Sequence, residues 1–164
     1  ERLRSEGKNA PEASCLPVGV PYITTHPRPF KIVQMPRLII MLYEKDTTYR
    51  QIYMDGRPLP RDPNPSFMGY SVGRWEAETL VIESVGYRDG GWLDGVGHPH
   101  SEQLHLTERY RRRDFGHLSI EMTIDDPTTY TKPFTYTQPA ALLPDTDLLE
   151  YYCTENEKDI RHFK

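Results

Sequence analysis

The sequence lacks any long apolar run and any excess of positive charge. Its longest apolar stretch runs only from Leu38 to Tyr43, whereas a bilayer-spanning helix needs roughly 20 apolar residues. The formal net charge is -4, and domains that bind nucleic acid usually carry a basic excess. We therefore expect no membrane span and no nucleic-acid partner.

Cysteine is also scarce, because the chain contains only Cys15 and Cys153. A disulfide between them would close a loop through almost the whole chain, which suits a secreted domain. The alternative is two unrelated buried thiols. The chain begins at Glu1 rather than Met, so we interpret it as a processed or truncated product. A secreted or periplasmic location is the expectation.

The composition that is present suits one packed domain. The chain has 164 residues, of which 37% are hydrophobic, 27% charged and 11% aromatic. Residues 1–29 are polar and then proline-rich, which predicts an extended N-terminal arm. Residues 30–154 are expected to form the single domain, and residues 155–164 a polar C-terminal tail.

Short segments rich in β-branched and aromatic residues follow one another from Phe30 onward. Their spacing of roughly 8 to 12 residues is typical of an all-β sandwich or barrel. We predict a small antiparallel β-barrel, a meander like that of lipocalins, with a cupin-type double-sheet barrel as the alternative. The expected strands cover residues 31–34, 38–44, 48–54, 69–75, 79–85, 104–112, 118–124, 129–137 and 147–153.

The hairpin around residues 104–124 has a register that the sequence can specify. A three-residue turn with Gly116 in the left-handed conformation pairs Glu108 with Met122 and Tyr110 with Ile120. A turn one residue shorter or longer would mix charged and apolar side chains on one face, so burial selects this register. Glu108 is therefore expected to face the interior, where an unpaired carboxylate is costly.

A cluster of titratable residues precedes this hairpin. His98, His100 and Glu102 occupy alternate positions, and imidazole with carboxylate is a ligand set for a divalent transition metal. The spacing partly resembles the first cupin motif, although the glutamate follows the second histidine too closely. Without a metal, Glu108 or Glu102 would act as a general base with His100 as its partner. The third interpretation is structural, with solvent-exposed histidines and Glu108 paired with Arg112 or another inward arginine.

A glycine-rich loop over residues 86–97 lies beside this cluster in the sequence. It holds five glycines together with Trp92 and Asp94, and loops of this kind are often functional or mobile. We expect Trp92, Asp94 and the inward Tyr110 to contact a ligand.

Several stretches resemble a known protein family. They are PFKIVQMPRLIIMLYE, YRQIYMDGRPLPRDPNPSFMGYSVGRWEAETLVIES, GHPHSEQLHLTERYRRRDFGH, TIDDPTTYTKPF and LLPDTDLLEYYCTENEKD. They are similar to a family of small uncharacterised proteins that are abundant in soil bacteria, notably acidobacteria, and typically follow a secretion signal. The resemblance covers about residues 15–159. It implies export and supplies no catalytic residues.

Two functions compete for this chain. The first is a secreted barrel enzyme whose inward His/Glu site performs lyase, isomerase or hydrolase chemistry on a small-molecule or sugar-derived substrate. The second is a non-catalytic barrel that binds a small apolar or aromatic ligand. A third possibility, an interaction protein, would use the proline-rich segments. An extended N-terminal arm would also suit a homodimer.

Overall fold

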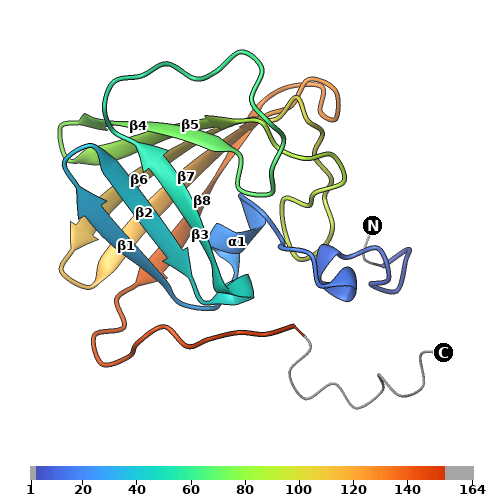
Figure 1. Cartoon of the computed structure of the whole chain (residues 1–164), viewed down its shortest axis with the longest axis horizontal. Helices are drawn as coiled ribbons and strands as arrows, with labels where there is room; N and C mark the ends of the chain where they lie inside the picture. The colour runs from blue at the N-terminus through green and yellow to red at the C-terminus, as the bar shows by residue number, and fades with distance from the viewer. Residues whose placement is uncertain (1–2, 154–164) are drawn as a thin grey trace.

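The computed structural model describes residues 3–153 and shows an all-β fold (Figure 1). The only helices in this part of the chain are one turn or so long. In chain order the elements are η1 (Pro11–Ser14), α1 (Tyr22–Thr25), β1 (Phe30–Met35), β2 (Leu38–Tyr43), η2 (Lys45–Thr47), β3 (Thr48–Tyr53), β4 (Tyr70–Glu76), β5 (Thr79–Val85), β6 (His105–Asp114), β7 (His117–Asp125) and β8 (Phe134–Ala141). The predicted C-terminal tail at 155–164 lies outside the described residues.

The eight strands form a single sheet in sequential order, β1 to β8. All neighbours are antiparallel except β3 and β4, which are parallel over two residue pairs, Ile52 with Ser71 and Tyr53 with Val72. This pair is parallel because the connection over residues 54–69 carries the chain back along the sheet before β4 begins. The sheet curls into a half-barrel with β1 and β8 as its two edges. The all-β, barrel-like prediction is confirmed, and one sheet rather than the double sheet of the cupin alternative is present.

The register of the β6–β7 hairpin is the predicted one. Glu108 pairs with Met122 and Tyr110 with Ile120. The predicted turn geometry is wrong in detail, because the register shifts between Arg112 and Asp114 and Gly116 does not adopt a positive φ. The bulge thus lies in the strand before the turn, where it preserves the same inward face.

Alternation along the strands places one set of side chains in the interior of the half-barrel. On β6 the inward residues are Leu106, Glu108 and Tyr110, and the paired strands continue the same face. This face makes most of the core, which includes Ile39, Met41, Tyr43, Ile52, Leu80, Ile82, Ile120, Met122 and Ile124. The core therefore lies inside the curl of the sheet.

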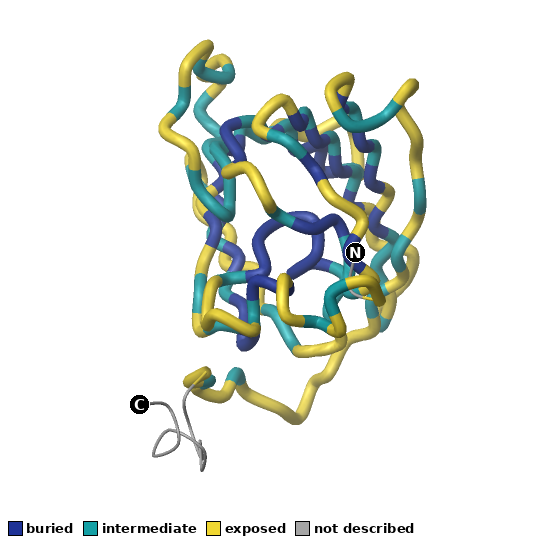
Figure 2. The backbone as a smooth tube through the Cα atoms, turned by 90° about the vertical axis from the view of Figure 1, so that its right-hand side faces the viewer, coloured by how far each residue is buried: buried dark blue, intermediate teal, exposed yellow. Residues whose placement is uncertain are grey.

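The N-terminal segment does more than lie on the domain as an extended arm. Residues 18–24 are buried and contribute Val18, Val20 and Ile23 to the core. Figure 2 shows this buried segment, which includes α1, inside the ring made by the strands. The Val20 amide donates a hydrogen bond of 3.1 Å to the carbonyl of Phe67, which ties the segment to the loop after β3. The segment plugs one end of the half-barrel because its apolar residues would otherwise face water.

Two predicted strands differ from the structure. The strand expected at 129–137 lies at Phe134–Ala141 instead, and residues 147–153 form no strand. The earlier residues, 126–130, form a turn in which Asp126 accepts hydrogen bonds from the amides of Thr128 and Thr129. Backbone groups that are hydrogen-bonded within a turn cannot also pair with a neighbouring strand.

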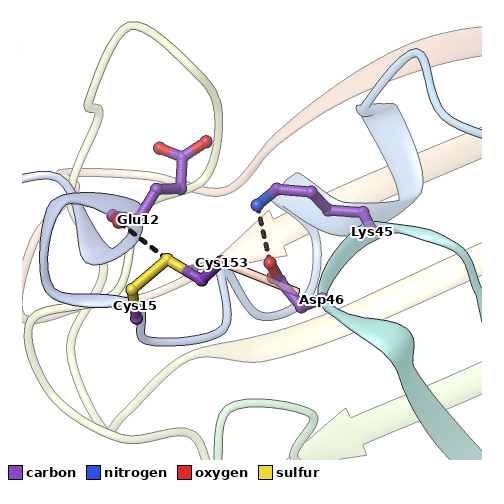
Figure 3. The surroundings of a disulfide bond; sticks show 5 residues. All are labelled: Glu12, Cys15, Lys45, Asp46 and Cys153. Carbon is purple, nitrogen blue, oxygen red and sulfur yellow. Dashed lines mark hydrogen bonds and ion pairs between the residues drawn. A yellow bond between two sulfur atoms is a disulfide. The ribbon is translucent and has the colours of Figure 1, made fainter. Parts of the chain in front are cut away.

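The predicted disulfide between Cys15 and Cys153 is present (Figure 3). It holds the end of the segment 142–153, here called the C-terminal strap, against the N-terminal segment. Beside it, Lys45 Nζ lies 2.6 Å from Asp46 Oδ1, and the other oxygen of Asp46 accepts a 3.0 Å hydrogen bond from the Val18 amide. The bond thus joins the N-terminal segment to the end of the C-terminal strap, next to η2.

Candidate functional site

An ion pair lies at the centre of the half-barrel. Alternation along β3 turns Arg50 inward, opposite Met41 of β2, and alternation along β6 turns Glu108 inward, opposite Ile82 of β5. Arg50 Nη2 lies 2.5 Å from Glu108 Oε2, and both side chains are 0% exposed. The predicted inward position of Glu108 is therefore observed, and its partner is Arg50 of β3. Arg112 is not the partner, because its guanidinium bonds the carbonyl oxygens of Asp114 and Phe115.

Hydroxyl groups complete the surroundings of this pair. Arg50 donates from Nε to Ser71 Oγ at 2.9 Å and from Nη2 to Ser84 Oγ at 2.7 Å. The Tyr110 hydroxyl donates to Glu108 Oε1 at 3.1 Å. Both carboxylate oxygens of Glu108 are thus occupied. Charges this deep persist only when they are paired and hydrogen-bonded.

Burial also fixes the protonation of the groups near the pair. Burial raises the pKa of Tyr43, Tyr87 and Tyr110. Burial opposes the charge on Arg50, but Glu108 outweighs it and holds the pKa of the guanidinium well above its ordinary value. The site therefore presents a charged pair of zero net charge and neutral tyrosine hydroxyls.

Arg50 Nη1 is a buried polar atom at this site with no hydrogen-bond partner among residues 3–153. The buried Tyr87 hydroxyl interacts with the side chain of Ser84, and Thr24 with that of Tyr43. Tyr87 reaches the interior because Gly86, with φ of +77°, turns the chain at the end of β5. Buried polar groups are almost always hydrogen-bonded, so the unpaired Nη1 of Arg50 is unusual.

His100 is buried at the edge of this region. Its ring makes an edge-on contact with Tyr87, with centroids 5.7 Å apart. A Cβ on Gly91 would lie 2.1 Å from His100 Nε2, so the ring packs where only glycine leaves room. Burial lowers the pKa of His100. His100 Nδ1 lies 3.2 Å from the Ser101 carbonyl oxygen, and no hydrogen bond joins it to Glu108 within the described chain.

The predicted metal ligands are not brought together. His98 is exposed, with Nδ1 2.6 Å from Asp94 Oδ2, and Glu102 lies in an exposed turn, whereas His100 points inward. Among residues 3–153 there is no group of three His, Cys, Asp or Glu side chains that could hold a metal ion. The inward alternation stops before Glu102 because β6 begins only at His105.

Asp94 and Trp92, predicted to contact a ligand, occupy structural positions in the glycine-rich loop. Asp94 accepts hydrogen bonds from the amides of Val96, Gly97 and His98. Burial opposes ionisation of Asp94, but the hydrogen bonds from His98 and Val96 outweigh it and lower its pKa. Trp92 is buried and its backbone bridges to Pro99. Both residues hold the loop closed.

A cleft runs along the open seam between β1 and β8, here called the seam cleft. Its volume is about 670 Å³. Inward residues of the two edges line it, and the C-terminal strap and the end of α1 border it. The lining includes Thr24, Phe30, Ile32, Leu118, Gln138 and Ala140. A smaller cleft, about 530 Å³, lies at the other end around Met35, Met54 and Trp75.

Cationic side chains at the seam cleft already have partners. Arg28 Nη1 lies 3.1 Å from Glu44 Oε1, and Lys31 Nζ lies 3.7 Å from Asp147 Oδ1. Arg112 donates to the carbonyl oxygen of Phe115 at 2.7 Å. The cleft is therefore mainly an apolar surface with compensated charge at its rim.

Sequence reasoning missed Arg50 and Tyr87. Arg50 shares the parity of Ile52 within one expected strand, which was a usable signal for an inward arginine. Tyr87 gave no such signal because it lies beyond the strand.

The described residues contain no helix long and apolar enough to cross a membrane. Comparisons of the chain with protein-family models, curated proteins and solved structures gave no match.

Proposed function

We propose that this chain is a non-catalytic binding protein that holds a small apolar or aromatic molecule in the seam cleft. The observation that carries the proposal is the open seam itself, where inward apolar side chains of β1, β7 and β8 line a volume of about 670 Å³. Ligand pockets usually measure about 300 to 1,000 Å³ and are mainly apolar.

The arrangement of Glu108 does not favour the enzyme hypothesis. Arg50 and Tyr110 occupy both oxygens of this carboxylate, and a general base needs a free oxygen within reach of a substrate proton. The enzyme hypothesis remains a prediction. Loss of turnover in Glu108→Gln would not identify a base, because the same change leaves Arg50 buried and unpaired.

Export of the protein is part of the proposal. The disulfide between Cys15 and Cys153 supports it, because such bonds persist in oxidising compartments. A small exported barrel with an apolar cleft would sequester or carry a poorly soluble molecule.

Binding of the neutral fluorescent dye Nile red tests the proposal. We expect a saturable increase in dye fluorescence with the folded protein, and recovery of the dye chemically unchanged. Ala140→Trp fills the seam cleft and should weaken binding at least tenfold. Thr137→Trp makes a comparable change on the exposed outer face of the same strand and should leave binding unchanged.

Two results would overturn this function. Absence of saturable binding by the wild-type protein would remove the binding role. Equal affinity of the wild-type and Ala140→Trp proteins for the dye would show that the dye binds outside the seam cleft. In that case Trp75→Ala would show whether the cleft around Met54 holds it.

A further inference from the structure

The strand β1 forms one edge of the sheet and is exposed along almost its whole length (Figure 1). Its apolar residues Ile32, Val33 and Met35 are 36%, 37% and 38% exposed. Among the described strands, β1 pairs with β2 alone. Proteins usually protect such an edge with proline, a bulge or charge. The only charge on β1 is Lys31, which already lies 3.7 Å from Asp147, so the edge is open to a further strand.

The backbone of β1 directs hydrogen-bonding groups at the seam. The Glu44 amide donates to the Pro29 carbonyl oxygen at 3.1 Å, so these two residues form a hydrogen-bonded pair. Bonded and non-bonded pairs alternate along an antiparallel ladder, and every second residue after Pro29 therefore bonds to β2. The residues between them, Phe30, Ile32 and Gln34, direct their N–H and C=O groups away from β2. These are the groups that a further strand would bond.

The opposite edge, β8, is less suited to strand addition. The Leu142 amide donates to the Gly116 carbonyl oxygen at 2.7 Å. By the same alternation, the backbone groups of Thr137, Pro139 and Ala141 face the seam. Pro139 has no N–H to donate, and proline on an edge strand discourages pairing. A further strand would therefore pair with β1.

The directions of the two edge strands also favour one inserted strand. Every ladder between β1 and β8 is antiparallel except the one between β3 and β4. The chain direction therefore reverses six times across the sheet, and β1 and β8 run the same way. A strand in the seam that is antiparallel to β1 is antiparallel to β8 as well. Such a strand would complete the barrel.

The size of the seam cleft limits the occupant to one short segment. A strand takes up about 3.4 Å of length per residue, about 4.8 Å of sheet width and about 10 Å of depth, which is about 160 Å³ per residue. The cleft of about 670 Å³ therefore holds about four residues in extended conformation. The β1 strand of a second copy carries β2 on its other side, and two paired strands need about twice this space.

We propose that the seam binds an extended segment of a partner protein, which pairs antiparallel with β1 and carries apolar side chains at alternate positions. Residues directly opposite each other in such a pair point to the same face. Side chains opposite Phe30 and Ile32 therefore enter the cleft, where Leu118 and Ala140 line the far side. The side chains between them point to solvent and are free to be polar. The inference goes beyond the proposed function, because it depends on the backbone of β1.

A seven-residue peptide with alternating valine and threonine and a lysine at each end tests the inference. It carries an N-terminal rhodamine and an amidated C-terminus, and fluorescence anisotropy measures its affinity for the wild-type protein. With the valines in the cleft, the valine N–H groups bond to β1 and the threonine N–H groups point away from it. We expect N-methylation of the valine amides to weaken binding at least tenfold, and more than N-methylation of the threonine amides. Equal losses, or the reverse order, would overturn pairing with β1.

A proline in β1 locates the effect on the protein. Ile32→Pro removes one seam-facing N–H and leaves the bonds to β2 in place, because proline is tolerated where the N–H faces away from the ladder. Ile32→Ala shortens the side chain and keeps the N–H. We expect Ile32→Pro to bind the peptide at least tenfold more weakly than Ile32→Ala, whereas Nile red should bind both variants alike. Urea unfolding checks that both variants fold, and the N-methylated peptides decide the question if Ile32→Pro does not.

The outcomes separate this inference from the proposed function. Binding of Nile red without saturable binding of the peptide would overturn the inference and leave the binding function standing. Binding of the peptide without binding of the dye would do the reverse. Dimerisation of the wild-type protein in sedimentation, lost in Ile32→Pro but kept in Ile32→Ala, would assign the edge to a second copy of this chain and overturn the partner segment.

Discussion

At the scale of single residues, the pair Arg50 and Glu108 dominates the interior. Two buried charges contribute little net stability when they are paired, because their desolvation cost offsets their attraction. The desolvation cost lowers the stability of the protein when one partner is removed and the other stays buried. Serine and tyrosine hydroxyls surround the pair, so each charge also depends on neighbours from other strands.

Removing either charge should destabilise the protein strongly. We expect Glu108→Leu or Arg50→Met to lower the free energy of unfolding by about 3–5 kcal/mol, because each leaves its partner buried and uncompensated. The double variant Arg50→Met with Glu108→Leu should cost clearly less than the sum of the two single changes. Urea unfolding of the four proteins measures this, and additive losses would mean that the two groups are not coupled.

The buried His100 predicts a pH dependence of stability. Burial lowers its pKa in the folded protein below the value of 6.5, so the unfolded chain takes up the proton first as the pH falls. The stabilisation from neutral His100 is therefore complete above about pH 6.5 and is lost below it. His26, whose pKa burial also lowers, contributes in the same direction.

Urea unfolding between pH 7.5 and 5.5 checks this expectation. The wild-type protein should lose stability over this range, His100→Gln should lose less, and the variant that also carries His26→Gln should lose least. An identical loss in the wild type and in His100→Gln would show that the imidazole titrates alike in both states.

At the scale of elements, the glycine-rich loop is held by specific contacts. Asp94 organises its tip through three amides, and Asp126 anchors its end by accepting a 2.6 Å hydrogen bond from the Ser101 amide. The loop is thus an ordered part of the surroundings of Tyr87 and His100. Position 91 is a glycine because the His100 ring leaves no room for a side chain there.

Gly91→Ala should therefore disturb the loop through one contact. We expect a loss of about 1–3 kcal/mol, which is typical of overpacking, because the new methyl group would occupy the position of the His100 ring. The same change in a His100→Ala background should cost much less. Thermal or urea unfolding of the four proteins gives the coupling, and an equal cost in both backgrounds would place the clash elsewhere.

Local sequence patterns predicted the positions of the strands better than they predicted the contacts between distant strands. The β6–β7 hairpin was predictable because its turn is short and one slip in register would expose its apolar face. The contact between Arg50 and Glu108 was not, because it joins residues 58 apart in the chain. It depends on how β3 meets β4 after the proline-rich connection, and no local alternation specifies that parallel pair. The burial of residues 18–24 likewise depends on a cavity that other elements create.

At the scale of the whole molecule, the C-terminal strap borders the seam cleft without pairing as a strand. Leu149 donates its amide to Glu44 Oε2 at 3.1 Å, and Tyr151 donates its amide to Thr47 Oγ1 at 2.8 Å. The Tyr151 ring lies under Arg28 and Lys45. These few contacts leave the disulfide as the main constraint that keeps the strap in place.

Loss of the disulfide should lower global stability. The bond joins residues 138 apart in the sequence, and the chain-entropy model gives about 4–5 kcal/mol for a loop of this size. We expect the double variant Cys15→Ser with Cys153→Ser to show a loss of this order in urea unfolding. Wild-type protein reduced with dithiothreitol should match it. A loss below about 1 kcal/mol would mean that the strap and the N-terminal segment hold each other without the bond.

The disulfide also brings distant parts of the chain together, since the Cα atoms of Cys15 and Cys153 are 5.6 Å apart. A short peptide linker could span this distance, and the exposed proline-rich connection around residues 57–62 takes part in no strand pair. The chain therefore lends itself to circular permutation, with new ends opened in that connection. Such a permutant would keep every strand pair and would make β4 to β8 precede β1 to β3 during synthesis.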